Sequence, residues 1–219
     1  MALIPTLLAL GVGVGLGIRW GGNFGNVADW RPELWMAGLG GVTLWIVLDV
    51  TSLTGSLAVL LRLVGLVLVL AFAVLNVRTG GMVLVAAGVG LNLLVTLLNW
   101  GMPVSGSALG SSGAAPEGVE VDTLVLTGGR EVADGAVLGF LGDVIPLPWG
   151  QVLSIGDLLW LTGLALVTAS VMRRYQARGG RGRSYSASLS ALGRGPAPRR
   201  GPGLHPSRLG DRGSGRSRR

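Results

Sequence analysis

Hydrophobic and polar positions alternate in long blocks along this chain. Apolar runs occupy residues 2–18, 34–53, 56–77, 81–99 and 152–172. Each run is close to the ~20 residues that a helix needs to cross a hydrocarbon core of ~30 Å. Backbone polar groups find no partner in lipid, so a crossing segment of this kind must be helical. The pattern therefore predicts an all-α, polytopic membrane protein with about five transmembrane helices.

Tryptophan residues support the ends of these predicted spans. Five of the seven tryptophans lie at predicted boundaries: Trp20, Trp30, Trp35, Trp100 and Trp149. An indole ring is apolar but carries one hydrogen-bond donor, and it favours the membrane–water interface.

Two segments lie outside the predicted spans. Residues 100–151 form one long loop, in which residues 119–129 alternate in a way typical of a short strand. An apolar stretch follows, which Pro146 and Pro148 prevent from being one helix, so we expect it to pack on the helix ends or enter the interface. Residues 173–219 are rich in Arg, Gly, Ser and Pro, which predicts a disordered tail. The expected domains are thus a transmembrane domain, 1–172, and a tail, 173–219.

The charge distribution predicts an orientation. The chain has a net charge of +7, all 18 basic residues are arginine, and 13 of them follow Met172. If the C-terminus is cytoplasmic, the inner loops hold Arg19, Arg31 and Arg78, and the outer loop holds Arg130. The positive-inside rule then places the protein in a bacterial plasma membrane with the N-terminus outside and the long loop extracytoplasmic.

The Arg-rich tail has two candidate partners. Anionic lipids of the inner leaflet attract basic segments of this kind, and this is the partner that we expect. Nucleic acid is disfavoured, because Tyr175 and Tyr185 are the only aromatic residues among the arginines.

Three charged residues fall within the predicted spans. Asp49, Arg62 and Asp157 lie roughly 6–9 Å below the outer boundary, and a charge costs ~2.5–3.5 kcal/mol at a helix centre. The second and third spans are joined by a short turn, so Asp49 and Arg62 can face each other. We predict an intramembrane polar cluster in which Arg62 pairs with Asp49 and Asp157 joins. The alternatives are side chains that reach the interface independently and a ligand or proton site.

Small and amide residues form rows on two spans. The row on the fourth span predicts a helix–helix contact, with the lining of a polar cavity as the alternative. A row at compatible spacing on the third span suggests that the two faces oppose each other. The first row is Gly88, Asn92, Thr96 and Asn99, and the second is Arg62, Gly65, Phe72 and Asn76.

The first span carries two overlapping small-xxx-small pairs. The spacing of four residues that lets helix backbones approach closely occurs in two pairs, Gly11–Gly15 and Gly13–Gly17. We expect close packing within the bundle or with a second copy of the chain.

Residues that carry chemistry are scarce. The chain has no Cys and one His, His205 in the tail, which excludes thiolate metal sites and argues against a Ser–His pair. The acidic residues of the long loop are scattered and indicate a solvated face rather than a metal site. We therefore expect no metal, no cofactor and no enzymatic activity.

The expected function is that of a structural or accessory component of the membrane. Its expected partners are the lipid bilayer and either a second copy or another membrane protein. The alternative is a small transporter or channel with an outward-facing polar vestibule around the intramembrane charges.

Three motifs carry a resemblance to a known family. They are LGDVIPLPWGQVLSIGDLL at Leu141–Leu159, LNWGMPVS at Leu98–Ser105 and RWGGNFGNVADWR at Arg19–Arg31. With these motifs the chain resembles the bacterial domain-of-unknown-function family 5317 over about Ala2–Ser170. The resemblance implies a multi-pass membrane protein with no assigned activity and supplies no catalytic residues. The family-like loop positions are Gly142, Asp143, Pro146 and Pro148.

Overall fold

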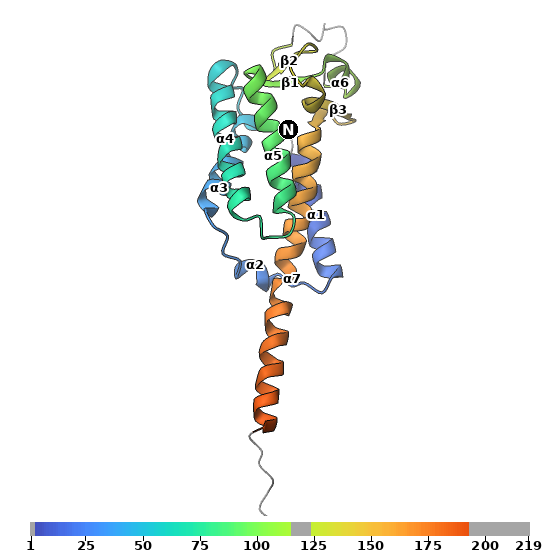
Figure 1. The fold of residues 1–219 in the computed structure, drawn as a ribbon. Helices are drawn as coiled ribbons and strands as arrows, with labels where there is room; N and C mark the ends of the chain where they lie inside the picture. The colour runs from blue at the N-terminus through green and yellow to red at the C-terminus, as the bar shows by residue number, and fades with distance from the viewer. Residues whose placement is uncertain (1–2, 115–123, 193–219) are drawn as a thin grey trace, which may run out of the picture. The chain divides into compact units, whose positions relative to one another are not determined.

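A computed structural model describes residues 3–114 and 124–192 of the chain. The chain divides into two units, Met1–Arg178 and Gly179–Arg219. The first unit holds every element up to the body of the last helix, and the fold described below is that of this unit (Figure 1).

The fold is mostly helical. Five longer helices are joined by short connections or by one small sheet, and two short helices, α2 (Gly25–Ala28) and α6 (Gly106–Ser111), lie between them. The longer helices are α1 (Leu3–Arg19), α3 (Trp35–Val50), α4 (Gly55–Leu75), α5 (Met82–Asn99) and α7 (Ile155–Leu192).

Three helical segments are long and apolar enough to cross a membrane: Gly55–Leu75, Met82–Asn99 and Ile155–Arg173. Helices α1 and α3 are apolar but shorter, at 17 and 16 residues. The structure thus shows three candidate membrane-spanning helices within a larger helical bundle.

A four-stranded sheet corrects the all-α expectation. Its strands are β1 (Met102–Val104), β2 (Arg130–Val132), β3 (Asp143–Leu147) and β4 (Gln151–Ser154), in the order β2-β1-β3-β4. Strand β1 pairs in parallel with β2 and β3, and β3 pairs antiparallel with β4. The two prolines that exclude a long helix are compatible with this arrangement, since Pro146 lies in β3 and Pro148 in the turn before β4.

We call residues 101–114 and 124–154, with this sheet, α6 and the 3-10 helix η2 (Gly139–Leu141), the lid. Figure 1 shows the lid at one end of the bundle, the sheet end, and the α4–α5 connection at the other, the turn end.

Several boundaries differ from those expected. The last helix begins at Ile155 rather than at residue 152, because residues 152–154 belong to β4. The strand expected within residues 119–129 is absent from the described part of that range, 124–129, and β2 follows it directly. The backbone of the expected disordered tail is helical through Leu192, and residues 193–219 lie outside the described residues.

Glycines allow close helix contacts. A Cβ at Gly88 of α5 would lie 2.6 Å from the backbone nitrogen of Trp160 in α7, and a Cβ at Gly13 of α1 would lie 2.6 Å from the carbonyl oxygen of Ala165. Gly13 and Gly17 thus form the close contact with α7, whereas Gly11 and Gly15 have nothing within 4 Å of an added Cβ. One of the two pairs on the first span therefore packs within the bundle.

The row on the third span faces a different neighbour from the one expected. A Cβ at Gly65 of α4 would lie 2.8 Å from the indole nitrogen of Trp45, which belongs to α3. The expectation that this row opposes the α5 row is therefore wrong at Gly65. The short α3–α4 turn makes these two helices neighbours, and the missing Cβ leaves room for the Trp45 ring.

An apolar core fills the body of the bundle. Its buried residues come from α4, α5 and α7, and Trp45 and Trp160 pack beside it with ring centroids 5.7 Å apart. The core residues are Leu66, Val69, Ala73, Met82, Val85, Val89, Val167 and Val171.

Candidate functional site

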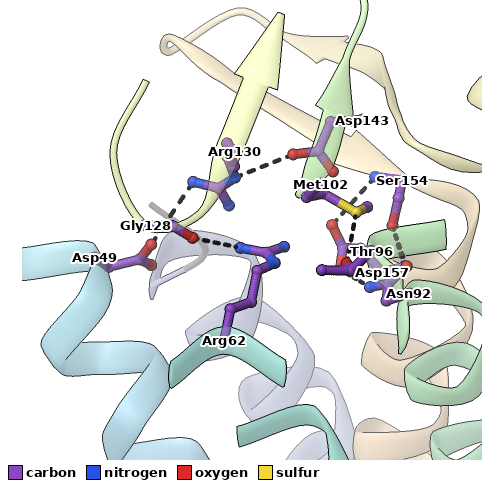
Figure 2. A network of polar contacts seen from close by, with 10 residues as sticks. All are labelled: Asp49, Arg62, Asn92, Thr96, Met102, Gly128, Arg130, Asp143, Ser154 and Asp157. Atoms are coloured by element: carbon purple, nitrogen blue, oxygen red, sulfur yellow. Dashed lines mark hydrogen bonds and ion pairs between the residues drawn. The ribbon is translucent and has the colours of Figure 1, made fainter. Parts of the chain in front are cut away.

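The three charged residues of the predicted spans line one cavity. Asp49 is the penultimate residue of α3, Arg62 lies two turns into α4, and Asp157 is in the first turn of α7. The cavity has a volume of about 60 Å³. Its lining residues are Trp45, Leu48, Asp49, Arg62, Leu66, Asn92, Arg130, Asp157 and Trp160. Figure 2 shows the three charged side chains close to the strands of the lid.

The size of this cavity limits what it can hold. Pockets for organic ligands usually measure about 300–1,000 Å³. About 60 Å³ admits water-sized molecules or a small ion instead.

Arg130 of the lid joins two carboxylates from different parts of the fold. Its Nε donates to Oδ2 of Asp143 in β3 at 3.1 Å, and its Nη1 lies 3.7 Å from Oδ1 of Asp49 in α3 (Figure 2). The Asp143 side chain is 2% exposed and that of Asp49 is 18% exposed. Arg130 therefore links the lid to the bundle through a largely buried pair of ion contacts.

A two-glycine turn places Arg130 over the cavity. Gly128 and Gly129 have φ values of +70° and +71°, a region that favours glycine. A Cβ at Gly129 would lie 3.1 Å from the carbonyl oxygen of Ala58 in α4. Arg62 Nη1 donates to the Gly128 carbonyl at 3.2 Å, so this turn is held by the bundle as well as by the sheet.

The sheet sets the position of Asp143. Its register aligns Asp143 with Val104 of β1 on one side and with Ser154 of β4 on the other. Gly142, directly before it, packs against Pro103, and an added Cβ there would lie 2.5 Å from the Pro103 carbonyl oxygen. The family-like loop motif thus places a carboxylate under the sheet.

Asp157 and Ser154 form a reciprocal cap at the start of α7. Ser154 Oγ accepts the Asp157 N–H at 2.9 Å, and Asp157 Oδ2 accepts the Ser154 N–H at 3.1 Å. This is the geometry of a capping box, with Asp in the place of the usual Glu. Asn92 of α5 donates to Asp157 Oδ1 at 2.8 Å and accepts from Ser154 Oγ at 2.9 Å.

The electrostatics of the cluster are unbalanced. Three carboxylates, from Asp49, Asp143 and Asp157, face two guanidinium groups, from Arg62 and Arg130. Burial raises the pKa of Asp143 to about 6, although Arg130 and Arg62 pull it down. Burial also lowers the pKa of Arg130, but the carboxylates of Asp143 and Asp49 outweigh it and leave that pKa above its usual value.

Two buried polar atoms of the cluster have no hydrogen-bond partner within the described residues. They are Nε of Arg62 and Oδ1 of Asp143. Buried polar atoms are nearly always paired, so each such exception needs a physical explanation.

The structure therefore brings Asp49, Arg62 and Asp157 together, but Arg130, rather than an Asp49–Arg62 pair, lies between the charged groups. The structure pairs Asp49 with Arg130, and it bonds Arg62 to the Gly128 carbonyl. The direct pairing of Asp49 with Arg62 stays a prediction.

The α5 row has more than one role. Gly88 contacts α7, Asn92 belongs to the cluster, and Thr96 is fully buried with its Oγ1 3.6 Å from Sδ of Met102. Asn99 bonds to both the N–H and the carbonyl of Val137 in the lid. The row thus packs against α7 and also fastens the lid.

Sequence reasoning missed Arg130 as a member of the cluster and assigned Asp143 to a solvated face. The second expectation is wrong, because Asp143 is 1% exposed. Asp143 lies in an apolar stretch of the loop, and that is the signal that separates it from the other loop carboxylates. For Arg130, the preceding Gly128–Gly129 pair was the available signal, because two consecutive glycines indicate a turn that can fix the position of the next residue.

Among the described residues, no group of three or more His, Cys, Asp or Glu could hold a metal ion. The single histidine, His205, lies outside the described residues.

Comparison with known proteins gives one match. The model of a family of unknown function (DUF5317) matches residues 34–169. All five charged residues of the cluster lie in the matched range, whereas α1 and the Arg19–Arg31 motif precede it. A search of curated proteins and a search of solved structures each gave no match. Since the match covers more than half of the chain, the protein belongs to the DUF5317 family.

Proposed function

We propose that this protein crosses the membrane five times, with α1 and α3 as the two additional spans. At ~1.5 Å per residue each of these apolar helices is about 25 Å long, close to the thickness of a hydrocarbon core. Both pack along helices that are long enough to cross, α1 on α7 and α3 on α4. This packing supports a common orientation for all five helices.

The charges at the turn end support a cytoplasmic location for that end. Arg173 lies 5.1 Å from the ring of Trp20, next to Arg19, and Arg78 lies in the α4–α5 connection. Arg31 follows α2, which is bonded to α7 through Asn26 and the Met172 carbonyl. With these arginines inside the cell, the N-terminus and the lid are outside, in a bacterial plasma membrane.

The function we infer is that of a non-enzymatic structural or accessory membrane component. The observation that carries this proposal is the apolar core that fills the bundle between the charged cluster and the turn end. A transport path would need polar groups along its length. The core residues Val69 and Val89 are 4% and 0% exposed, and they occupy the region that such a path would cross.

Cysteine labelling tests this proposal, because the chain has no natural cysteine. In native membranes, Val89→Cys should be unreactive toward a water-soluble maleimide, whereas Ser111→Cys in the exposed part of the lid should react. Rapid labelling of Val89→Cys would contradict the proposal and indicate an aqueous path.

Co-purification after mild solubilisation is a second test, and it should yield a constant partner, either another membrane protein or a second copy. Protein recovered as a monomer with no companion would contradict the accessory role.

A small transporter or channel is the second candidate, and the charged cavity is the observation that favours it. Five charged side chains at the sheet end resemble an outward-facing vestibule. Proteoliposomes separate the two candidates. A flux of small ions above that of empty liposomes, lost in Arg130→Met, would favour transport over the accessory role.

We also propose that the Arg-rich tail contacts anionic lipids of the inner leaflet, at about 1 kcal/mol per basic residue near the surface. A peptide of residues 173–219 should bind phosphatidylglycerol vesicles and not phosphatidylcholine vesicles. Equal binding to both would contradict this.

A further inference from the structure

The charged cluster has one more carboxylate than it has guanidinium groups. Among the described residues of the cluster, two guanidinium groups can balance two of the three carboxylates, so one carboxylate is in excess. A buried charge without a counter-charge is strongly unfavourable, and such a group usually takes up or loses a proton instead.

Asp143 is the carboxylate best suited to take up that proton. It is the most buried of the three, and its Oδ1 has no hydrogen-bond partner within the described residues. Asp157, in contrast, accepts hydrogen bonds at both of its oxygens, and the Asp49 side chain is partly exposed.

Asp143 also lies where the lid meets the bundle. Its own strand and Arg130 belong to the lid, whereas Arg62 of α4 and Asp157 of α7 act on its charge from the bundle, and Asp49 of α3 is linked to it through the shared Arg130. Within the described residues, Arg130, Arg62 and Asp157 act on the charge of Asp143 directly, and Asp49 acts through Arg130. Separation of the lid from the bundle would bring water to Asp143, and that water would screen its repulsion by Asp157.

We propose that Asp143 is a proton-binding site and that the bound proton favours closure of the lid on the bundle. The thermodynamic link is a difference in proton affinity between two states. With the lid closed, burial raises the pKa of Asp143 to about 6, and with the lid open and the group solvated it returns toward 3.8. The closed state therefore binds the proton more tightly, so its advantage is largest in acid and falls as the pH rises through about 6.

The size of the effect follows from these two values. Between pH 7.5 and pH 5, the ratio of closed to open lid should increase about tenfold. This pH dependence is opposite to that of an ordinary ion pair. The carboxylate of an ordinary pair has a lowered pKa, so the pair weakens in acid. The proposal does not depend on which compartment the lid faces. If the lid faces outward, as proposed above, it responds to the external pH.

The test is a cysteine at the position where α4 meets the Gly129 turn of the lid. Ala58 is fully buried, and its carbonyl oxygen lies against Gly129 of the lid. The full chain is reconstituted in nanodiscs, and the maleimide reaction rates of Ala58→Cys and of the exposed Ser111→Cys are measured at each pH. The ratio of the Ser111→Cys rate to the Ala58→Cys rate defines the protection of Ala58→Cys. Taking this ratio removes the intrinsic pH dependence of the thiol. The protection of Ala58→Cys should be about tenfold greater at pH 5 than at pH 7.5. Equal protection at both pH values, or greater protection at pH 7.5, would overturn the proposal. This test requires no substitution of Asp143.

A pair of variants assigns the effect. Asp143→Asn, which is neutral at every pH, should show the same protection at pH 5 and pH 7.5. Glu131→Gln removes an exposed carboxylate next to Arg130 and should retain the tenfold change. If Asp143→Asn retains the full pH dependence, the proton binds elsewhere and the proposal fails.

Discussion

The two ends of the bundle are held together by different chemistry. At the sheet end, charged side chains from α3, α4, α7 and the lid meet around Arg130. At the turn end, neutral side chains bond to backbone groups. Asn76 bonds to both the N–H and the carbonyl of Glu33, Asn26 donates to the Met172 carbonyl, and Ser170 donates to the Gly80 carbonyl.

This difference determines how each end responds to a lost contact. When one member of a buried ion pair is removed, the remaining charge is left without compensation, at a cost of about 3–5 kcal/mol. A neutral hydrogen bond contributes about 1 kcal/mol when water can replace it. Loss of one charged group at the sheet end should therefore cost more stability than loss of one neutral contact at the turn end.

The largest expected effect is that of Arg130→Met. This change leaves Asp143 and Asp49 without their shared guanidinium group, and it should lower the free energy of unfolding by about 3 kcal/mol, near the lower limit for buried pairs because Arg130 is partly exposed. Denaturant titration in detergent micelles measures it. Arg31→Met is the matched control at the turn end, since Arg31 is exposed and bonds to the Ala28 carbonyl, and it should cost less than about 1 kcal/mol. Equal losses in the two variants would remove the distinction between the ends.

A smaller effect is expected where α5 meets α7 near the sheet end. Gly88→Ala would place a Cβ against the backbone of Gly156 and Trp160, so the helices must separate, at a cost of about 1–3 kcal/mol. Gly90 of the same helix has a Leu70 methyl at 3.9 Å from an added Cβ, which is ordinary contact. Gly90→Ala should therefore be neutral or stabilise by up to about 1 kcal/mol through helix propensity. Thermal unfolding of both variants checks the pair, and a destabilising Gly90→Ala would argue against the described packing.

The smallest effect concerns two asparagines in matching roles at opposite ends. Asn76 bonds the N–H and carbonyl of Glu33, and Asn99 bonds the N–H and carbonyl of Val137. Glu33 and Val137 are exposed, so water can replace the lost bonds, and each Asn→Ala change should cost about 1 kcal/mol. Similar losses would show that charge, rather than location, separates the two ends. A much larger loss for Asn99→Ala would show that the lid is fastened chiefly by this contact.

The helices could be predicted from the sequence because their signal is local. The ends of α4 and α5 lie within two residues of the predicted spans, since uninterrupted apolar runs of this length permit few other structures. The α5 row was likewise visible, because the spacing of Gly88, Asn92, Thr96 and Asn99 follows the helix period.

The lid could not be predicted in the same way. Its strands have three to five residues, and β1 pairs with residues 28 positions later in the chain, at Met102 and Arg130. Such pairing depends on long-range contacts that a short apolar stretch does not encode. Because the sheet brings Arg130 and Asp143 together, the centre of the cluster was missed, while the residues that helices carry into it, Asp49, Arg62 and Asp157, were found.

The central proposal is that the lid lies outside the cell and the turn end inside. Labelling of intact cells with a membrane-impermeant maleimide tests this proposal most directly. Ser111→Cys in the lid should be labelled in intact cells, and Val77→Cys, exposed in the α4–α5 connection, should be labelled only after the membrane is permeabilised. Labelling of Val77→Cys in intact cells, with Ser111→Cys protected, would reverse the proposed orientation, and labelling of both would contradict a membrane-spanning bundle.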